Sequence, residues 1–174
     1  RTKHGIYPIY HAIIDDHNIC AELLLDAKAD ITQSSNDDTP IWMCAYNDNV
    51  TILNKLLCLK ADPNIKDTEY NLTPLFIAAE RGHVDIMKRL IFHKVNLEQC
   101  MDDGSTALFG ACSYDKIKCL KELVNAKADI NACNILDVSP LFQSILEEHY
   151  ECAEYLLKQP NINVELTELP STYI

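Results

Sequence analysis

A two-residue pattern recurs along the chain at a nearly constant interval. Its five copies start 32, 34, 33 and 33 residues apart. The copies are Tyr7-Pro8, Thr39-Pro40, Thr73-Pro74, Thr106-Ala107 and Ser139-Pro140. A fixed period of this size is typical of a solenoid, in which one supersecondary unit stacks on copies of itself. The functional question therefore becomes which surface the array presents.

The residues around each copy predict two short helices per repeat. Pro suits the first helical turn, and the Thr or Ser before it is an expected N-cap. Apolar residues then recur at helical spacing, as at Val84, Met87, Leu90 and Ile91. Helices of eight or nine residues are marginal alone and must be held by stacking. Three positions before each Pro (Ala107 in the fourth copy) the chain has residues that tolerate the left-handed backbone of a tight turn: Gly5, Asp37, Asn71, Gly104 and Asp137.

The third repeat has the most specific sequence, which reads TPLFIAAERGH from Thr73 to His83 and continues to Leu90-Ile91 and Asn96. This segment resembles an ankyrin repeat, and the resemblance extends from about residue 4 to residue 164. It implies an all-α fold, an α-solenoid of helix-turn-helix repeats joined by projecting β-hairpin fingers. The fingers and the first helix of each repeat would form a concave face.

The spacing divides the chain into repeats that we expect to form one domain over residues 1–174. The five repeats are expected at about 4–32, 36–65, 70–98, 103–132 and 136–165. Thr172 lies one period after Ser139, so residues 166–174 are expected to be a truncated sixth repeat or a tail. We therefore interpret the chain as a segment of a longer protein.

Two columns of the repeat depart from the family pattern. Two positions after the Pro, where the family usually has His, the chain has Tyr10, Trp42, Phe76, Phe109 and Phe142. One aromatic residue per repeat favours core packing over a ligand-binding stripe. After the second helix, where the family prefers Gly, the chain has Lys28, Lys60, Lys94 and Lys127. We interpret these lysines as solvated helix ends in a left-handed backbone rather than as an anion-binding stripe, because charges about one repeat apart are largely screened.

Charge and cysteine placement limit the partners and the compartment. The net charge of −11 argues against a nucleic-acid surface, and no apolar run approaches the roughly 20 residues that span a bilayer. Cys20, Cys119 and Cys152 share a column with Ile52 and Ile86, which predicts buried, reduced thiols. An intracellular, cytoplasmic protein is the corresponding prediction.

No constellation of residues predicts chemistry. The four glycines form no phosphate-binding loop, and no paired cysteines two residues apart suggest a zinc site. His17, His83 and His149 recur at a spacing of 66 between the two helices, which indicates a structural turn. We therefore expect no enzyme, metal or cofactor. Similarity to hydroxylated ankyrin segments implies Asn64 and Asn131 as possible hydroxylation sites.

The resemblance also implies where partners bind, namely the finger tips and the exposed end of each first helix. Carried over by column, the predicted concave surface comprises Asp38, Tyr46, Asn47, Glu69, Tyr70, Leu72, Glu80, Arg81, Asp103, Ser113 and Tyr114, with Asn36, Asp102 and Ser105 beside them. Tyrosines among carboxylates suit a protein interface, and the acidic balance favours a protein or peptide with Lys or Arg.

The fifth repeat has apolar residues in columns that we expect to be exposed: Ile135, Leu136, Val138 and Leu146. These residues form either a hydrophobic contact for a partner or a surface that the sixth repeat and the tail cover. We favour the second alternative, in which the chain itself covers them. The sequence thus predicts a non-catalytic protein-interaction module, monomeric as an isolated domain. The alternative is a regulatory or spacer domain of a larger enzyme or ion channel.

Overall fold

A computed structural model describes residues 7–32, 39–67 and 69–165 of the chain. Over these residues it has ten α-helices and no β-strand. The first helices of the repeats are α1 (Pro8–Ile14), α3 (Pro40–Tyr46), α5 (Pro74–Arg81), α7 (Ala107–Ser113) and α9 (Pro140–Leu146). The second helices are α2 (Asn18–Asp26), α4 (Val50–Cys58), α6 (Val84–Phe92), α8 (Ile117–Asn125) and α10 (Tyr150–Leu157).

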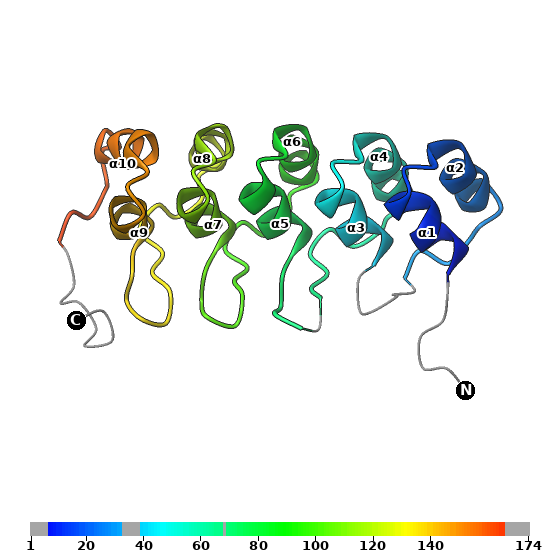
Figure 1. Ribbon diagram of the computed structural model, residues 1–174, viewed down its shortest axis with the longest axis horizontal. Coiled ribbons are helices and arrows are strands. Elements are labelled where there is room, and N and C mark those ends of the chain that lie inside the picture. Colours follow the sequence, from blue (N-terminus) through cyan, green and yellow to red (C-terminus); the bar gives the residue numbers. More distant parts are fainter. Residues whose placement is uncertain (1–6, 33–38, 68, 166–174) are drawn as a thin grey trace.

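The helices form two parallel rows, with the loops between repeats projecting beside the first helices (Figure 1). Each helix packs on its partner within the repeat and on the like helix of the next repeat, as α5 packs on α6 and α7. Leu56, Leu90 and Leu123, one from each of three successive second helices, are fully buried in the seam. The all-α solenoid expected from the period is thereby confirmed.

Three of the four expected Thr or Ser N-caps are confirmed. The hydroxyl oxygens of Thr73, Thr106 and Ser139 accept hydrogen bonds from the backbone N–H three residues later, at 3.1, 3.3 and 3.1 Å. The prediction is wrong for Thr39, whose backbone has the same extended conformation but whose hydroxyl makes no cap bond. The Thr39 Oγ1 atom is buried and has no hydrogen-bond partner in the described part of the chain.

Substituting the two threonines by Val is expected to give opposite results. Thr73→Val removes a cap bond and should lower the free energy of unfolding by about 1 kcal/mol. Thr39→Val removes a buried hydroxyl without a partner, so stability should be unchanged or raised by up to about 1 kcal/mol. Urea denaturation of the two variants checks this. Equal losses would show that the Thr39 hydroxyl is paired in solution.

The loops before the third, fourth and fifth repeats are tight fingers, closed by hydrogen bonds between their described residues rather than by regular strands. The fourth finger has Met101 N–H donating to the Ser105 carbonyl at 3.0 Å and turns at Gly104, where φ is 80°. A Cβ atom at Gly104 would lie 3.0 Å from the backbone nitrogen of Ile135 in the next finger, so only Gly fits there. Asn71 and Asp137 have φ of 58° in the equivalent turns, as expected. The other two turn residues, Gly5 and Asp37, lie outside the described residues.

Four of the five second helices end in a left-handed residue, as the Lys column predicts. The φ angles of Lys28, Lys60, Lys94 and Lys127 are 59°, 64°, 57° and 72°. In the third repeat, Lys94 N–H donates to the Ile91 carbonyl and Val95 N–H to the Leu90 carbonyl, the paired bonds of a Schellman motif. A non-Gly residue in this geometry is strained by roughly 1–2 kcal/mol.

The cysteine column is buried only where a preceding repeat covers it. Cys119 and Cys152 are buried as predicted, and Cys119 Sγ lies 3.9 Å from the Ala78 carbonyl oxygen of the repeat before it. The prediction is wrong for Cys20, which is exposed. The column faces the preceding repeat, and within the described residues no repeat precedes α2.

The aromatic column packs inside, as predicted. Tyr10, Trp42, Phe76 and Phe109 are buried and Phe142 is half-buried. Trp42 also ties two repeats together, because its Nε1–H donates to the Leu72 carbonyl at 3.2 Å. The rings of Phe76 and Phe109 have a second role, since they line the largest hollow of the finger side.

Candidate functional site

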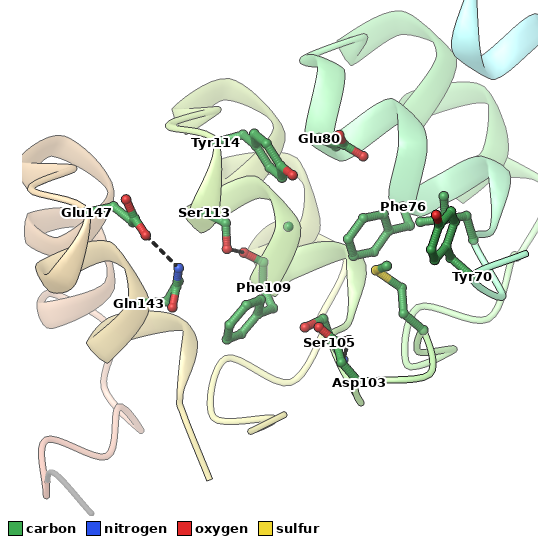
Figure 2. A pocket seen from close by; sticks show the side chains of 13 residues that line it. Tyr70, Phe76, Glu80, Asp103, Ser105, Phe109, Ser113, Tyr114, Gln143 and Glu147 are labelled. Atoms are coloured by element: carbon green, nitrogen blue, oxygen red, sulfur yellow. Dashed lines mark hydrogen bonds between the residues drawn. The ribbon is translucent and has the colours of Figure 1, made fainter. Parts of the chain in front are cut away.

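A hollow of about 540 Å³ lies between the fingers and the first helices of repeats three to five. Figure 2 shows its side chains converging from α5, α7, α9 and the preceding fingers. We call it the Gly110 hollow. Its lining residues are Tyr70, Leu72, Phe76, Glu80, Met101, Asp103, Ser105, Phe109, Gly110, Ser113, Tyr114, Gln143 and Glu147.

At Gly110 the hollow is lined by backbone without a side chain, whereas the same column has Met43 and Ile77 in the second and third repeats, both buried. A Cβ atom at Gly110 would lie 3.1 Å from the ring of Phe76, closer than ordinary van der Waals contact, so the ring packs directly against the Gly110 backbone. Gly inside a helix is less stable than Ala by roughly 1 kcal/mol. The fourth repeat thus has a less stable α7 and, in return, a close contact with the aromatic floor of the hollow.

The rim of the hollow carries three carboxylates and no cation. Glu147 accepts a hydrogen bond from Gln143 Nε2 at 3.2 Å (Figure 2), and Asp103 accepts one from the Ser105 backbone N–H at 2.9 Å. Glu80 lies beside Tyr114. None of the three carboxylates belongs to an ion pair among the described residues, and no Lys, Arg or His lines the hollow. Its negative charge is therefore not neutralised from within the described chain.

Two exposed tyrosines stand at the edges of the hollow, each beside a carboxylate. Burial, and then the charge and hydrogen bond of Glu80, raise the pKa of Tyr114. The hydrogen bond to Glu69 and the charge of that carboxylate raise the pKa of Tyr70. In Figure 2 Tyr114 and Glu80 lie on the same side of the hollow. Both phenols therefore stay protonated at neutral pH and present a ring face next to negative charge.

A buried hydroxyl without a partner lies at the base of the hollow. Ser105 is 2% exposed, and its Oγ atom has no hydrogen-bond partner among the described residues. The same column has Leu72 and Val138 in the neighbouring repeats, so an apolar residue fits this position. Leaving a buried hydroxyl unpaired costs about 1–3 kcal/mol, which a ligand that supplied the missing partner would offset.

One repeat earlier, the finger side is filled by the chain itself. The guanidinium carbon of Arg81 lies 3.4 Å from the centre of the Tyr46 ring, and Tyr46 stacks on Trp42 with ring centres 5.4 Å apart. Asn47 is also engaged, because its Nδ2 donates to the Ile13 carbonyl at 3.3 Å. These three predicted contact residues thus stabilise the packing of adjacent repeats.

The predicted concave surface divides into groups in the structure. Six of its residues line the Gly110 hollow: Tyr70, Leu72, Glu80, Asp103, Ser113 and Tyr114. Ser105, predicted beside them, lines it too, and Glu69 stands outside the hollow, bonded to Tyr70. Asp38 and Asn36 lie outside the described residues. Sequence reasoning missed Phe76, Met101, Phe109, Gly110, Gln143 and Glu147; the one available signal was the Gly in a column that elsewhere has His11, Met43, Ile77 and Gln143.

The apolar residues of the fifth repeat are not all exposed. Ile135 is 70% exposed, and Leu136 and Leu146 are exposed as well. The expectation is wrong for Val138, which is 2% exposed. Asn134 closes this finger by accepting the Val138 N–H on its side chain and donating its own N–H to the Val138 carbonyl, which holds Val138 at the buried base rather than at the tip. Whether a partner or another segment covers the three exposed residues stays a prediction.

The other residues singled out in the sequence have structural contacts. The Nδ1–H groups of His83 and His149 donate at 2.8 Å to the carbonyls of Ala45 and Cys112 in the preceding repeats. Asn64 Oδ1 accepts the Asn96 N–H at 2.7 Å, and Asn131 makes the equivalent bond to Asn163. Hydroxylation of these two asparagines stays a prediction.

The structure also bears on reactivity and membranes. Burial raises the pKa of the Cys119 thiol to about 11, so a thiolate is not populated there at neutral pH. Within residues 7–32, 39–67 and 69–165, no group of three His, Cys, Asp or Glu side chains is placed to hold a metal ion. Among these same residues, every helix is too short or too polar to cross a bilayer.

Comparison with known proteins agrees with the architecture. The family described as ankyrin repeats (3 copies) matches residues 1–67 and 75–168. The chain is 36% identical over 123 residues to alpha-latrocrustotoxin-Lt1a of Latrodectus tredecimguttatus, covering 69% of this chain and 9% of the toxin. It is 31% identical over 87 residues to mouse ankyrin repeat and SOCS box protein 11, covering 50% of this chain and 27% of that protein. It is 25% identical over 154 residues to human transient receptor potential cation channel subfamily A member 1, covering 86% of this chain and 14% of that protein.

The chain thus spans less than a third of the length of each of these relatives. What it shares with them is the repeat array, and ankyrin repeats are generally non-catalytic protein-interaction modules. The match covers most of the sequence and coincides with five helix pairs stacked in register. The chain belongs to the ankyrin repeat family.

Proposed function

We propose that this chain is a non-catalytic interaction module that docks a segment of a protein partner along its finger side, anchored in the Gly110 hollow. The hollow is the observation that carries the proposal. It joins three repeats, exposes Tyr70 and Tyr114 at its edges, and combines an aromatic floor with a polar rim. Aromatic anchors with a hydrogen-bonding end are the residues that dominate protein interfaces.

The net charge of −11 supports a partner segment that carries Lys or Arg. The described ion pairs do not neutralise this side, because all four are on second helices or their ends, as in Lys88–Glu122. In the same proposal, residues 1–174 form one domain that is monomeric in isolation. The eight free cysteines support an intracellular, cytoplasmic location.

Selection of displayed random peptides on the immobilised chain tests the docking side. Peptides that bind should lose at least roughly tenfold in affinity on the double variant Tyr70→Ala/Tyr114→Ala, since each truncated hot-spot residue costs about 1–2 kcal/mol. The control is Tyr150→Ala, which removes an exposed tyrosine from the second helix α10. Peptides that bind the double variant as tightly as the parent chain, or a selection that yields no peptide, would contradict the proposal.

A second candidate follows from the length of the relatives. The chain covers only 14% of the human channel and 9% of the spider toxin, so the array can be a regulatory or spacer domain within a longer enzyme or channel. In that case the hollow would receive another segment of the same polypeptide. The full-length sequence distinguishes the two, because a catalytic or membrane-spanning neighbour favours the second candidate.

A further inference from the structure

We infer that the Gly110 hollow binds one cationic side chain of the partner segment, and that this side chain is an arginine. The inference rests on the proposed docking function and names the chemistry of its anchor. Three uncompensated carboxylates, those of Glu80, Asp103 and Glu147, surround an aromatic floor in a space that no Lys, Arg or His of this chain enters. A guanidinium group satisfies both features, because it stacks on aromatic faces and donates to carboxylates in a planar fork.

The chain itself contains the corresponding contact one repeat earlier. Tyr46 and Arg81 occupy the sixth and seventh positions after the Pro in the second and third repeats, and the guanidinium covers the ring at 3.4 Å. Between the third and fourth repeats, Glu80 occupies the sixth position of the third repeat and Tyr114 the seventh position of the fourth. That step keeps an aromatic ring and adds a carboxylate, but it has no arginine of its own. We therefore place a guanidinium from the partner beside Tyr114 and Glu80.

The base of the hollow supports an incoming donor. Ser105 is buried, and its Oγ lacks a partner although Leu or Val fits the same column in neighbouring repeats. The hydroxyl oxygen can accept a hydrogen bond, as can the carboxylates, so the hollow offers acceptors to an incoming donor. Guanidinium carries five N–H donors and no acceptor, and it is less strongly hydrated than ammonium, which favours arginine over lysine in a partly enclosed site.

Gly110 leaves its part of the hollow without a side chain of its own. An Ile at this position, as the third repeat has at Ile77, would occupy the hollow above Phe76. Glu80 provides the charge nearest to Tyr114. The two substitutions Gly110→Ile and Glu80→Gln therefore remove space and charge separately. Glu80→Gln changes no volume, so it keeps the test decisive if Gly110→Ile fails to fold.

The test is titration of the isotopically labelled chain with N-acetyl-arginine amide, followed by amide chemical shifts. Saturable shifts are expected at Gly110, Ser105 and Tyr114. The uncharged isostere N-acetyl-citrulline amide should leave them unchanged, and N-acetyl-lysine amide should bind at least about threefold more weakly. Gly110→Ile should weaken arginine binding at least roughly tenfold by filling the site, and Glu80→Gln roughly three- to tenfold by removing a charge-assisted bond.

The matched control is Glu122→Gln, which removes a carboxylate on the second helix α8 that lies 3.5 Å from Lys88 and does not line the hollow. It should leave arginine binding unchanged. Equal shifts with citrulline, shifts spread over all acidic surfaces, or tighter binding of the lysine probe would each overturn the inference. If the arginine probe fails while selected peptides still depend on Tyr70 and Tyr114, docking on the finger side stands and only the arginine anchor is removed.

Discussion

Leu90→Ala is expected to lower the free energy of unfolding by about 3–5 kcal/mol, the range for deleting a leucine from a packed core that relaxes only partly. Leu90 is completely buried on α6, which packs on α4 and α8 in the adjacent repeats. The cavity therefore opens between three repeats. Because stability in a solenoid depends on nearest-neighbour interfaces, the effect extends beyond one helix. Guanidinium-induced unfolding followed by circular dichroism measures the loss.

The matched control is Phe92→Ala, two residues further along the same helix. Phe92 is 79% exposed, so its removal should change stability by no more than about 0.5 kcal/mol. Both residues are apolar, and a hydrophobicity count would treat them alike. Similar losses in the two variants would show that Phe92 is covered in solution and would contradict the described packing.

The fourfold substitution Lys28→Gly/Lys60→Gly/Lys94→Gly/Lys127→Gly is expected to raise stability. Each lysine has a left-handed backbone that costs roughly 1–2 kcal/mol for a residue with a side chain. Gly removes that cost but loses more chain entropy on folding, by about 0.5–1 kcal/mol. In salt that screens the lysine charges, the net gain is about 0.5–1 kcal/mol per site, or roughly 2–4 kcal/mol for four sites a repeat apart, whose effects should add. Thermal unfolding should shift upward by roughly 5–10 °C.

The control for this prediction is the same fourfold substitution to Ala. Ala removes the four charges, which interact favourably with the helix C-termini by about 0.3–1 kcal/mol each at low salt, but it keeps the strained backbone. We therefore expect the Ala variant to be no more stable than the parent chain. If the Ala variant gained as much stability as the Gly variant, the effect would come from the lysine charges. An unchanged melting temperature of the Gly variant would show that the lysine backbone is not strained.

Local features of the fold could be predicted because local sequence decides them. The position of four of the five first helices follows from the Pro at the start, as in α5 at Pro74. The left-handed turns follow from residue type and spacing at Asn71 and Gly104. Even the strained Lys94 could be foreseen, because the repeat requires a helix end there whatever residue fills it.

The candidate site was predictable in part. The column argument placed Tyr70, Glu80 and Tyr114 on one side, and all three line the hollow. It did not reveal the hollow, which depends on what a side chain in one repeat meets in the next. The ring of Phe76 packs over Gly110 from the neighbouring repeat, and a pattern read one repeat at a time contains no such contact.

The sequence by itself determined the repeating unit, its helix boundaries, its turns and the family, because these depend on backbone preferences and a period that any single repeat displays. Only the tertiary structure decided which members of a column are buried. Cys20 and Cys119 share a position, yet one is exposed and one is buried, because burial requires a neighbouring repeat. Tyr46 is covered by Arg81, whereas Tyr114 borders an open acidic space. The proposed binding surface was decided at the same level, since side chains of three repeats form the hollow.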